Sequence, residues 1–443
     1  MSLSNHPKAY GSAAIALAFT TGVLLTLGFK DFYPDLERRY QRKRRSSGDR
    51  SGGLHRGSVV SGNIVTLEDH ESEFADDKAH NAPAEGIEGC IGNTPLIKIQ
   101  SLSQATGRTI LAKAEFLNGA GNSPKDRVAL NMIREAEAAG LLVPHRGDTI
   151  YEGTVGSTGI SLATLARAKG YRAHIVMPDD MAMEKSDLLL QLGAAVERVT
   201  VAPITSPDHF VNRARRYAAE HAAKHRDGSR GFFANQFEAD ANWQAHLKTT
   251  GPEIWRQTAG DLQAFVAGAG TGGTMSGVAK YLKEEQKLSA VQIVLADPQG
   301  SGLYNKVRHG VMYSPTEREG TRRRQQVDTM VEGIGITRLT QNFEAGRELI
   351  DDAVKVTDDQ ACRMARWLVE HDGIFVGSSS SVNCVAAIAT AMTLPPGSRV
   401  VTILCDSGSR HLSKFWKHIK EMDREGENEA SDLFSELGIP NTS

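Results

Sequence analysis

Short apolar segments alternate with amphipathic helical patterns between residues 87 and 420, and this alternation constrains the fold more than any other feature. Glycine follows several of the helical patterns, as at Gly140, Gly170 and Gly193. Repeated strand–helix units predict an α/β protein whose parallel sheets are covered by helices on both faces. The predicted strands are residues 109–116, 149–152, 173–177, 264–267, 292–296 and 399–404. In such sheets, ligands bind beyond the carboxyl ends of the strands.

Three loops rich in glycine or serine lie at predicted strand ends. Residues 268–274 read Gly-Ala-Gly-Thr-Gly-Gly-Thr, and their N–H groups with the Thr271 and Thr274 hydroxyls would form a phosphate cradle at a helix start. They also fit G-x-G-x-x-G, with Asp297 ending the next strand, so a dinucleotide site is an alternative. Residues 152–159 form a second strand-to-helix loop. In the third, 375–382, the serines serve either as a helix N-cap or as partners of a heteroaromatic ring nitrogen.

Lys125 stands at the start of a predicted helix, after a loop of small and turn-forming residues. Residues 118–127 read Asn-Gly-Ala-Gly-Asn-Ser-Pro-Lys-Asp-Arg. The positive end of a helix disfavours an ammonium group. The residue is therefore either a solvated lysine or an amine kept neutral for a Schiff base with a carbonyl cofactor. Two anion-type loops in the same chain favour the second interpretation, with a phosphorylated cofactor and a carboxylate substrate.

Chain length, net charge and cysteine spacing limit the organisation and the partners that this chain can have. A length of 443 residues exceeds what one core usually serves, so two lobes are expected. The formal net charge of −2 lacks the basic excess of a nucleic-acid-binding surface, so no nucleic-acid partner is predicted. The four cysteines are far apart, without histidines at ligand spacing, which predicts a reduced compartment and no metal: Cys90, Cys362, Cys384 and Cys405.

Residues 1–45 are predicted to be a membrane anchor. Residues 11–29 carry no charge, and as a helix they would span about 28 Å, close to the hydrocarbon thickness of a bilayer. Basic residues follow at Lys30 and within 38–45, so the rest of the chain is expected to face the cytosol. A cleaved signal, a matrix transit peptide and a core helix are the alternatives. Modest hydrophobicity and basic flanks fit the mitochondrial outer membrane.

The segments around the body differ from it in composition. Residues 46–86 are rich in Ser, Gly and acidic residues and are predicted to be a flexible linker. Residues 421–443 are predicted to be an acidic, solvated tail. Within the catalytic body, 87–420, we expect a smaller lobe at about 119–240. The larger lobe would combine 87–118 with 241–420.

Taken together, the motifs resemble the cysteine synthase and cystathionine β-synthase group of pyridoxal-phosphate enzymes, over nearly the whole body. They are Ile91–Leu96, Lys125–Arg127, Gln236–Phe237, Thr249–Ile254, Gly270–Thr274, Gly333–Gly335 and the serines at 378–381. The resemblance implies fold type II, the two-lobed, open twisted parallel-sheet fold of the tryptophan synthase β-like enzymes, and a homodimer. The predicted membrane anchor at 1–45 looks like that of fungal cysteine synthase-like proteins assigned to the mitochondrial outer membrane.

The resemblance also implies roles for individual residues. Lys125 would hold pyridoxal 5′-phosphate as a Schiff base and move the α-proton of the substrate. The phosphate would be bound by Gly270, Thr271, Gly272, Gly273 and Thr274, and Ser379 would face the pyridine nitrogen. The substrate carboxylate would be held by Thr154, Val155, Gly156, Thr158 and Gln236. A neutral serine does not favour a charged pyridinium, which suits β-elimination.

The sequence departs from the family pattern at two loops. The lysine loop has one residue more than the usual Asn-x-Gly-Gly-Ser-Val-Lys, and Pro124 precedes the lysine. In the second loop Val155 replaces a hydroxyl residue, and Ser157 replaces the Asn that bonds the cofactor's ring oxygen. These departures bear on substrate identity and on catalytic efficiency.

The resemblance implies a β-replacement in which O-acetyl-L-serine and sulfide give L-cysteine and acetate. Alternatives are a cystathionine β-synthase-like activity, although no room is expected for a regulatory module, and a serine or threonine dehydratase. The motifs at 91–96 and 249–254 favour the synthase branch. From another class, the chain could be a membrane-tethered, cofactor-binding interaction protein with little turnover.

Overall fold

The computed structural model describes residues 83–181, 183–312, 329–425 and 430–439. The chain divides into two compact units, 1–82 and 83–443, and the described residues all belong to the second. The predicted membrane helix at 11–29 and most of the predicted linker lie outside the described residues. Within the part that is described, no helix is both long and apolar enough to cross a membrane.

The larger of two sheets has six strands in the order β1-β2-β10-β7-β8-β9. β1 runs antiparallel to β2, and all other neighbours are parallel. Its central strands are almost wholly buried and rich in β-branched residues, as expected for strands covered on both faces. The strands are β1 (Leu96–Lys98), β2 (Thr109–Ala114), β7 (Ala264–Gly268), β8 (Gln292–Pro298), β9 (Asp352–Val356) and β10 (Arg399–Leu404).

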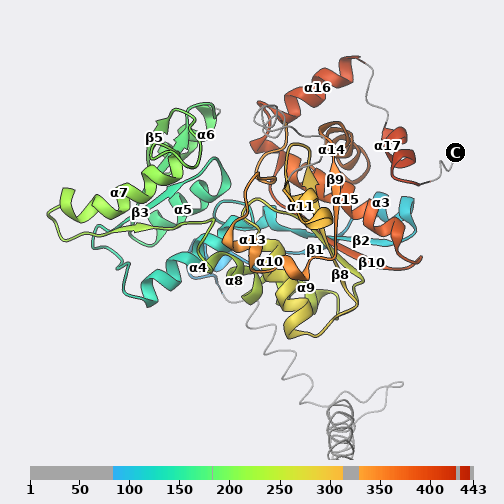
Figure 1. The fold of residues 1–443 in the computed structure, drawn as a ribbon, viewed down its shortest axis with the longest axis horizontal. Coiled ribbons are helices and arrows are strands. Elements are labelled where there is room, and N and C mark those ends of the chain that lie inside the picture. The colour runs from blue at the N-terminus through green and yellow to red at the C-terminus, as the bar shows by residue number, and fades with distance from the viewer. Residues whose placement is uncertain (1–82, 182, 313–328, 426–429, 440–443) are drawn as a thin grey trace, which may run out of the picture. The chain divides into compact units, whose positions relative to one another are not determined.

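The smaller sheet has four parallel strands in the order β5-β4-β3-β6. They are β3 (Thr149–Gly153), β4 (Arg172–Pro178), β5 (Ala195–Val199) and β6 (Gly231–Phe233). In Figure 1 this sheet and its helices, coloured green, lie to one side of the larger sheet. The predicted α/β fold with parallel sheets is confirmed, whereas the residue bounds of the two lobes stay a prediction.

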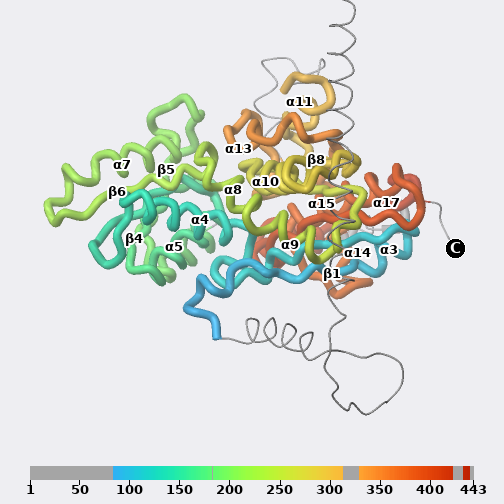
Figure 2. The backbone as a smooth tube through the Cα atoms, turned by 90° about the horizontal axis from the view of Figure 1, so that it is seen from below, coloured from blue at the N-terminus to red at the C-terminus, as the bar shows by residue number. Residues whose placement is uncertain are grey.

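Helices cover both faces of the smaller sheet. Ile150 packs with the apolar residues of α4 and α5, whereas a Cβ on Gly153 would touch the backbone of Val211 in α7, on the other face. Figure 2 shows α4 and α5 together, apart from α7. These helices are α4 (Lys125–Ala138), α5 (Ser157–Ala168), α6 (Met183–Gln191) and α7 (Phe210–Lys224).

The remaining helices pack around the larger sheet. The α-helices are α3 (Gln100–Thr106), α8 (Ala241–Lys248), α9 (Thr250–Gln257), α10 (Gly273–Ala279), α11 (Leu303–His309), α13 (Gln341–Glu344), α14 (Asp358–Asp372), α15 (Ser378–Thr393), α16 (Phe415–Glu425) and α17 (Ala430–Glu436). Short 3-10 helices are η1 (Ile87–Cys90), η2 (Glu115–Leu117), η4 (Arg347–Leu349) and η5 (Gly408–Arg410), and η3 (Lys280–Glu285) is a π-helical turn. α15 lies along β10, β7 and β8, which places its first turn at the carboxyl ends of these strands.

The prediction of a solvated tail from residue 421 is wrong for its apolar residues. Leu433, Phe434 and Ile439 are buried in the same core cluster as Phe415 and Ile419. Figure 1 shows α17 close to α14, and a ring contact joins Phe434 to Trp367. The many acidic residues of this segment masked an apolar helical face in the sequence.

Candidate active site

The loop before Lys125 is fixed by the side chain that follows the lysine. The carboxylate of Asp126 accepts hydrogen bonds from the N–H of Gly121 at 2.7 Å and of Ala120 at 3.2 Å. The Ser161 hydroxyl in α5 donates to the same carboxylate at 2.6 Å. From the carboxyl-terminal end of the chain, the Arg410 guanidinium donates to the carbonyl oxygen of Gly121. The loop is therefore closed on itself and bound to two distant segments.

Arg127 anchors the first turn of α4 in a buried cluster of charges. Its guanidinium bonds Glu115 at 2.8 Å and Glu253 at 2.6 Å, and Lys113 lies 2.5 Å from Glu253. The facing guanidinium overcomes the effect of burial and lowers the pKa of Glu115 to about 2. The strand predicted for 109–116 ends at Ala114, because η2 begins at Glu115. The Glu115 side chain bonds Arg127. Lys113, Glu115, Arg127 and Glu253 thus fix the direction in which α4 begins.

Lys125 has no hydrogen bond or ion pair from its amine within the described residues. Burial lowers its pKa, opposed in part by electrostatic interactions with Cys405, Asp406 and Glu115. An amine with a lowered pKa is unprotonated more often. The unprotonated amine is the nucleophile that attacks a carbonyl. The sequence-based argument for a reactive lysine is consistent with this environment.

Residues 270–274 form a loop in which a side chain at any of the glycines would collide with another part of the chain. A Cβ at Gly270 would strike the carbonyl oxygen of Gly333, and one at Gly273 would strike the side chain of Asn242. Gly272 has φ of +88°, and its Cβ would lie 2.5 Å from the Cα of Phe343. The glycines are therefore required by close packing and by a left-handed backbone.

The threonine side chains of this loop are held from outside it. Asn242 in α8 donates to the Thr271 hydroxyl at 2.9 Å. Thr274 lies 3.2 Å from Nε2 of His246, and burial lowers the pKa of His246 to about 3, so the ring is neutral at physiological pH. The loop therefore has fixed N–H and hydroxyl groups and no carboxylate, which is the donor set that an anion needs.

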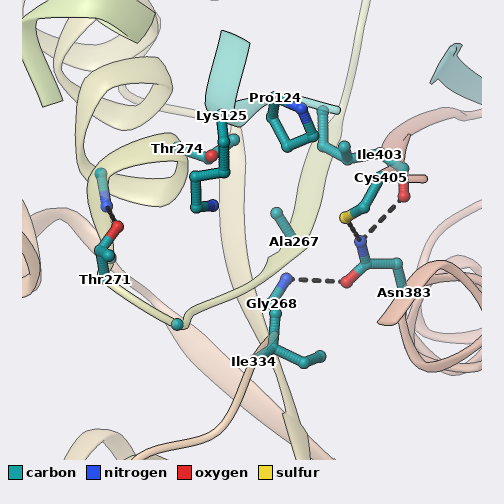
Figure 3. A pocket seen from close by; sticks show the side chains of 13 residues that line it. Pro124, Lys125, Ala267, Gly268, Thr271, Thr274, Ile334, Asn383, Ile403 and Cys405 are labelled. Carbon is teal, nitrogen blue, oxygen red and sulfur yellow. Dashed lines mark hydrogen bonds between the residues drawn. The ribbon is translucent and has the colours of Figure 1, made fainter. Parts of the chain in front are cut away.

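One pocket joins Lys125 to this glycine loop. It is lined by Pro124, Lys125, Ala267, Gly268, Gly270–Thr274, Ile334, Asn383, Ile403 and Cys405. In Figure 3 Lys125 and Thr274 lie together on one side, while Asn383, Ile403 and Cys405 lie on the other. Asn383 accepts from the N–H of Gly268 at 2.7 Å and donates to the carbonyl of Ile403 at 2.8 Å, which fixes the ends of β7 and β10.

The serine run lies behind this pocket, at the first turn of α15. Ser379 is 4% exposed and does not line the pocket. Its side chain interacts with the thiol of Cys405, which does line the pocket. Ser378 accepts from the N–H of Glu332, and Ser380 accepts from the N–H of Cys405. Burial, followed by the charge of Asp406, raises the pKa of Cys405 to about 11, so the thiol stays protonated.

The second loop, between β3 and α5, is built differently. The Thr158 hydroxyl donates to the Gln236 side chain at 2.6 Å, so two predicted carboxylate ligands are in contact. Thr154 accepts weakly from the N–H of Gly156 at 3.4 Å, and Val155 is 38% exposed. The Ser157 hydroxyl makes no hydrogen bond within the described residues. None of these residues lines the Lys125 pocket.

Asn242 connects the two loops. Its amide donates both to Thr271 of the glycine loop and to the backbone carbonyl of Gln236, at 2.9 and 2.7 Å. Asn342 donates to the same carbonyl of Gln236 at 3.0 Å. The predicted phosphate and carboxylate sites are thus joined by hydrogen bonds through a residue that the sequence analysis did not identify.

Cys405 and Asn383 were missed as well, although the sequence contained a signal for the first. The rule that ligands bind beyond the carboxyl ends of parallel strands applies to the strand predicted at 399–404, and Cys405 is the next residue. Nothing in the local pattern distinguishes Asn383 or Asn242, because both act through contacts with segments distant in sequence.

These residues fit pyridoxal phosphate as a group. The glycine loop supplies an anion cradle in which no side chain could be accommodated, and the Lys125 amine, which has no partner among the described residues, lies in the same pocket. Residues 87–406 match the family model described as pyridoxal-phosphate dependent enzyme. The chain belongs to this family of enzymes, which confirms the cofactor class and the resemblance predicted from the motifs.

Individual relatives narrow the comparison. Cysteine synthase 2 of Neurospora crassa is 70% identical over 452 residues, covering 99% of each chain. A Saccharomyces cerevisiae protein whose name carries the words mitochondrial cysteine synthase is 57% identical over 343 residues, covering 77% of this chain and 86% of its own. Among solved structures, O-ureido-L-serine synthase aligns with a TM-score of 0.63 and 31% identity, covering 75% of this chain and 95% of its own.

Proposed function

We propose that the chain is a cysteine synthase that replaces the β-substituent of O-acetyl-L-serine with sulfide, giving L-cysteine and acetate. The observation that carries the proposal is the 70% identity to a cysteine synthase over essentially the whole of both chains. The pocket supports it, because an amine with a lowered pKa and an anion cradle lie together there. O-acetyl-L-serine and sulfide are the small-molecule partners.

Bound pyridoxal phosphate supplies a carbonyl that links to amines and an electron-withdrawing ring that eases loss of an α-proton. Gly270, Thr271, Gly272, Gly273 and Thr274 would hold its phosphate through N–H and hydroxyl donors. Ser379 would meet the ring nitrogen as a neutral group beside the thiol of Cys405.

Lys125 would hold the cofactor and then, once displaced by the substrate amine, take the proton from the α-carbon and later return it. Its lowered pKa suits this role, because a general base must be largely unprotonated at the working pH. Thr154, Val155, Gly156 and Thr158 with Gln236 would hold the substrate carboxylate, and Ser157 would donate to the cofactor's ring oxygen. Acetate then leaves the β-carbon and sulfide adds there.

The proposed organisation includes segments beyond the described residues. A helix at 11–29 would anchor the chain in the mitochondrial outer membrane, with the catalytic body facing the cytosol and the tether between them. The yeast relative's name, which places that protein in the mitochondrion, is consistent with this destination. We further propose a homodimer and the lobe bounds given above, 119–240 and 87–118 with 241–420.

A parallel assay of the full-length chain tests the activity. O-acetyl-L-serine with sulfide should give cysteine faster than serine with homocysteine gives cystathionine, and faster than serine alone gives pyruvate. A cofactor-loaded protein that turns over none of these substrates would contradict the proposal and favour a cofactor-binding interaction protein.

The anchor has a separate test. Deleting residues 1–30 should release the protein from membranes while the visible absorbance of the bound cofactor stays. Loss of cofactor binding on this deletion would instead indicate that the segment belongs to the folded body.

A further inference from the structure

Glu152 is a fully buried carboxylic acid at the carboxyl end of β3, directly before the loop proposed to hold the substrate carboxylate. It accepts hydrogen bonds from the N–H of Gly153 at 3.1 Å and of Gln236 at 3.2 Å. Asn235 has φ of +55°, a left-handed conformation at the turn that brings successive N–H groups to the Glu152 carboxyl. Glu152 therefore holds together the ends of two neighbouring strands, β3 and β6.

No cation pairs with Glu152 among the described residues. Alternation along β3 puts its side chain on the face of Ile150, which is covered by α4 and α5. There, Asp126 is bound to Ser161 and to its own loop, while Arg127 is occupied by Glu115 and Glu253. On the opposite face, the titratable and charged groups include Tyr151, His174, Glu197, His209, Arg213, Tyr217 and His221.

A buried carboxylate without a cation is unfavourable, so the group takes up a proton instead. Burial raises the pKa of Glu152 to about 8, against the opposing effect of its hydrogen bonds from Gln236, Gly153 and Asn235. Glu115 shows the contrast within this chain, because it is equally buried but has Arg127 beside it and a pKa of about 2. At neutral pH Glu152 is therefore mostly uncharged.

The groups that Glu152 holds are the ones proposed to meet the substrate. Gln236 accepts from Thr158 at 2.6 Å and donates to the carbonyl of Gly153 at 3.3 Å. Gly153 leads directly into Thr154. A negative charge on Glu152 would lie immediately behind these groups and repel a bound carboxylate through a medium of low dielectric.

We propose that Glu152 is a positioning residue that works in its uncharged form. It aligns Gln236 and the start of the 154–158 loop for the carboxylate of the amino-acid substrate, and its ionisation weakens amino-acid binding. The inference rests on the proposed function, because it assumes that this loop receives the substrate carboxylate.

The sign of the pH dependence follows from linkage. Above about pH 8 the group loses its proton in the free protein and binding must restore it, so affinity falls by up to about tenfold per pH unit. Stability behaves similarly. The folded state binds more protons than the unfolded state between the ordinary value of 4.5 and about 8, so the free energy of unfolding falls as pH rises through this window.

The test compares the wild-type full-length chain, E152Q and D297N, each loaded with cofactor and purified in a mild detergent. L-alanine, which lacks a β leaving group, is titrated at about pH 7 and about pH 9.5, and binding is followed by the absorbance of the bound cofactor. Glutamine keeps the shape and one acceptor but cannot ionise. Asp297 is a matched control, since it is buried at the end of β8 with a pKa raised to about 6, in the other sheet.

We expect E152Q to bind alanine several-fold more weakly at pH 7 but to lose far less affinity than the wild type and D297N on going to high pH. Comparing the pH dependence of alanine affinity between the wild type and E152Q cancels the contributions from titration of alanine and of the cofactor, because both proteins share them. Equal losses in all three proteins would overturn the inference.

A second readout is the pH dependence of chemical unfolding of the same proteins without cofactor. Stability should fall less between pH 5 and 8 for E152Q than for the wild type, and an unchanged slope would show that Glu152 is not neutral. If no protein binds alanine at any pH, the proposed carboxylate site fails and takes the inference with it. The unfolding slope then still reports on the protonation of Glu152.

Discussion

The glycine loop at 270–274 and the proposed substrate loop at 154–158 both connect a parallel strand to a helix, yet they are held in opposite ways. In the first, added Cβ atoms at three glycines would collide with neighbouring segments. In the second, a Cβ on Gly156 would meet nothing within 4 Å, and Val155 is exposed. The first loop is shaped by its packing, whereas the second depends on Gln236 and Glu152 to hold it. If the proposed roles hold, the cofactor cradle is fixed in one geometry, whereas the loop for a substrate that enters and leaves has open space around it.

The largest expected effect is at Lys125, which lies in one pocket with the glycine loop. Lys125→Ala should lower turnover by several orders of magnitude, because acid–base catalysis alone supplies ~10²–10⁴-fold and the link to the cofactor is lost too. Lys125→Arg should not rescue, since a guanidinium stays protonated. Cofactor absorbance and cysteine formation measure both. An active Lys125→Arg protein with an intact band would instead assign the lysine a structural role.

The comparison between the loops is tested by placing the same methyl group in each. Gly272→Ala should weaken cofactor binding by roughly 10²-fold, about 3 kcal/mol, through strain at positive φ and collision with Phe343. Gly156→Ala should change cofactor affinity by less than about threefold, because its φ lies outside the left-handed region and the space around it is open. Fluorescence titration of the cofactor-free proteins measures both, and similar losses would remove the distinction.

Asn242 should couple the loops. Asn242→Ala leaves the Gln236 carbonyl with one donor fewer and releases Thr271, so cofactor and amino-acid affinity should both fall, each by about 5- to 100-fold. Asn342→Ala is the matched control, because it bonds the same carbonyl but not the glycine loop. Its effect should be confined to amino-acid binding. If Asn242→Ala changed only one of the two affinities, the hydrogen-bonded connection would carry no coupling.

The smallest effect is expected at Val155. Val155→Thr restores a hydroxyl at an exposed position and should change KM for O-acetyl-L-serine by less than about threefold, since an exposed group exchanges one water contact for another. Initial-rate kinetics with varied O-acetyl-L-serine would detect a larger change. A gain of tenfold or more would mean that the valine limits the natural enzyme.

The sequence predicted the parts of the molecule that depend on local pattern. Strand–helix alternation predicted the parallel sheets. The glycine loop was recognised from its glycine pattern, and the pattern exists because close packing permits only glycine there. The short strands β5, β6 and β9 were not predicted, nor was the antiparallel β1. Their pairing depends on neighbours far along the chain rather than on their own hydrophobic pattern.

Only part of the site was predicted from the sequence, again the part that depends on local pattern. Lys125, the glycine loop and Thr158 with Gln236 were identified from motifs, and the structure puts the first two in one pocket and the last two in contact. Asn242, Asn383 and Glu152 each have a hydrogen-bond partner that is distant in sequence, 29 to 115 residues away. No single segment therefore carries their signal. The buried apolar face of α17 was hidden by the acidic residues around it.

The order of strands in the larger sheet has a consequence for how the protein is made. β10, the last of the described strands to be synthesised, pairs with β2 on one side and β7 on the other. Until residue 404 has left the ribosome, two strand edges stay unpaired, and such edges are prone to pair with other chains. Cys405 and Arg410, which complete the pocket and clasp the lysine loop, emerge later still. The pocket for the cofactor is thus complete only after nearly all of the catalytic body has been synthesised.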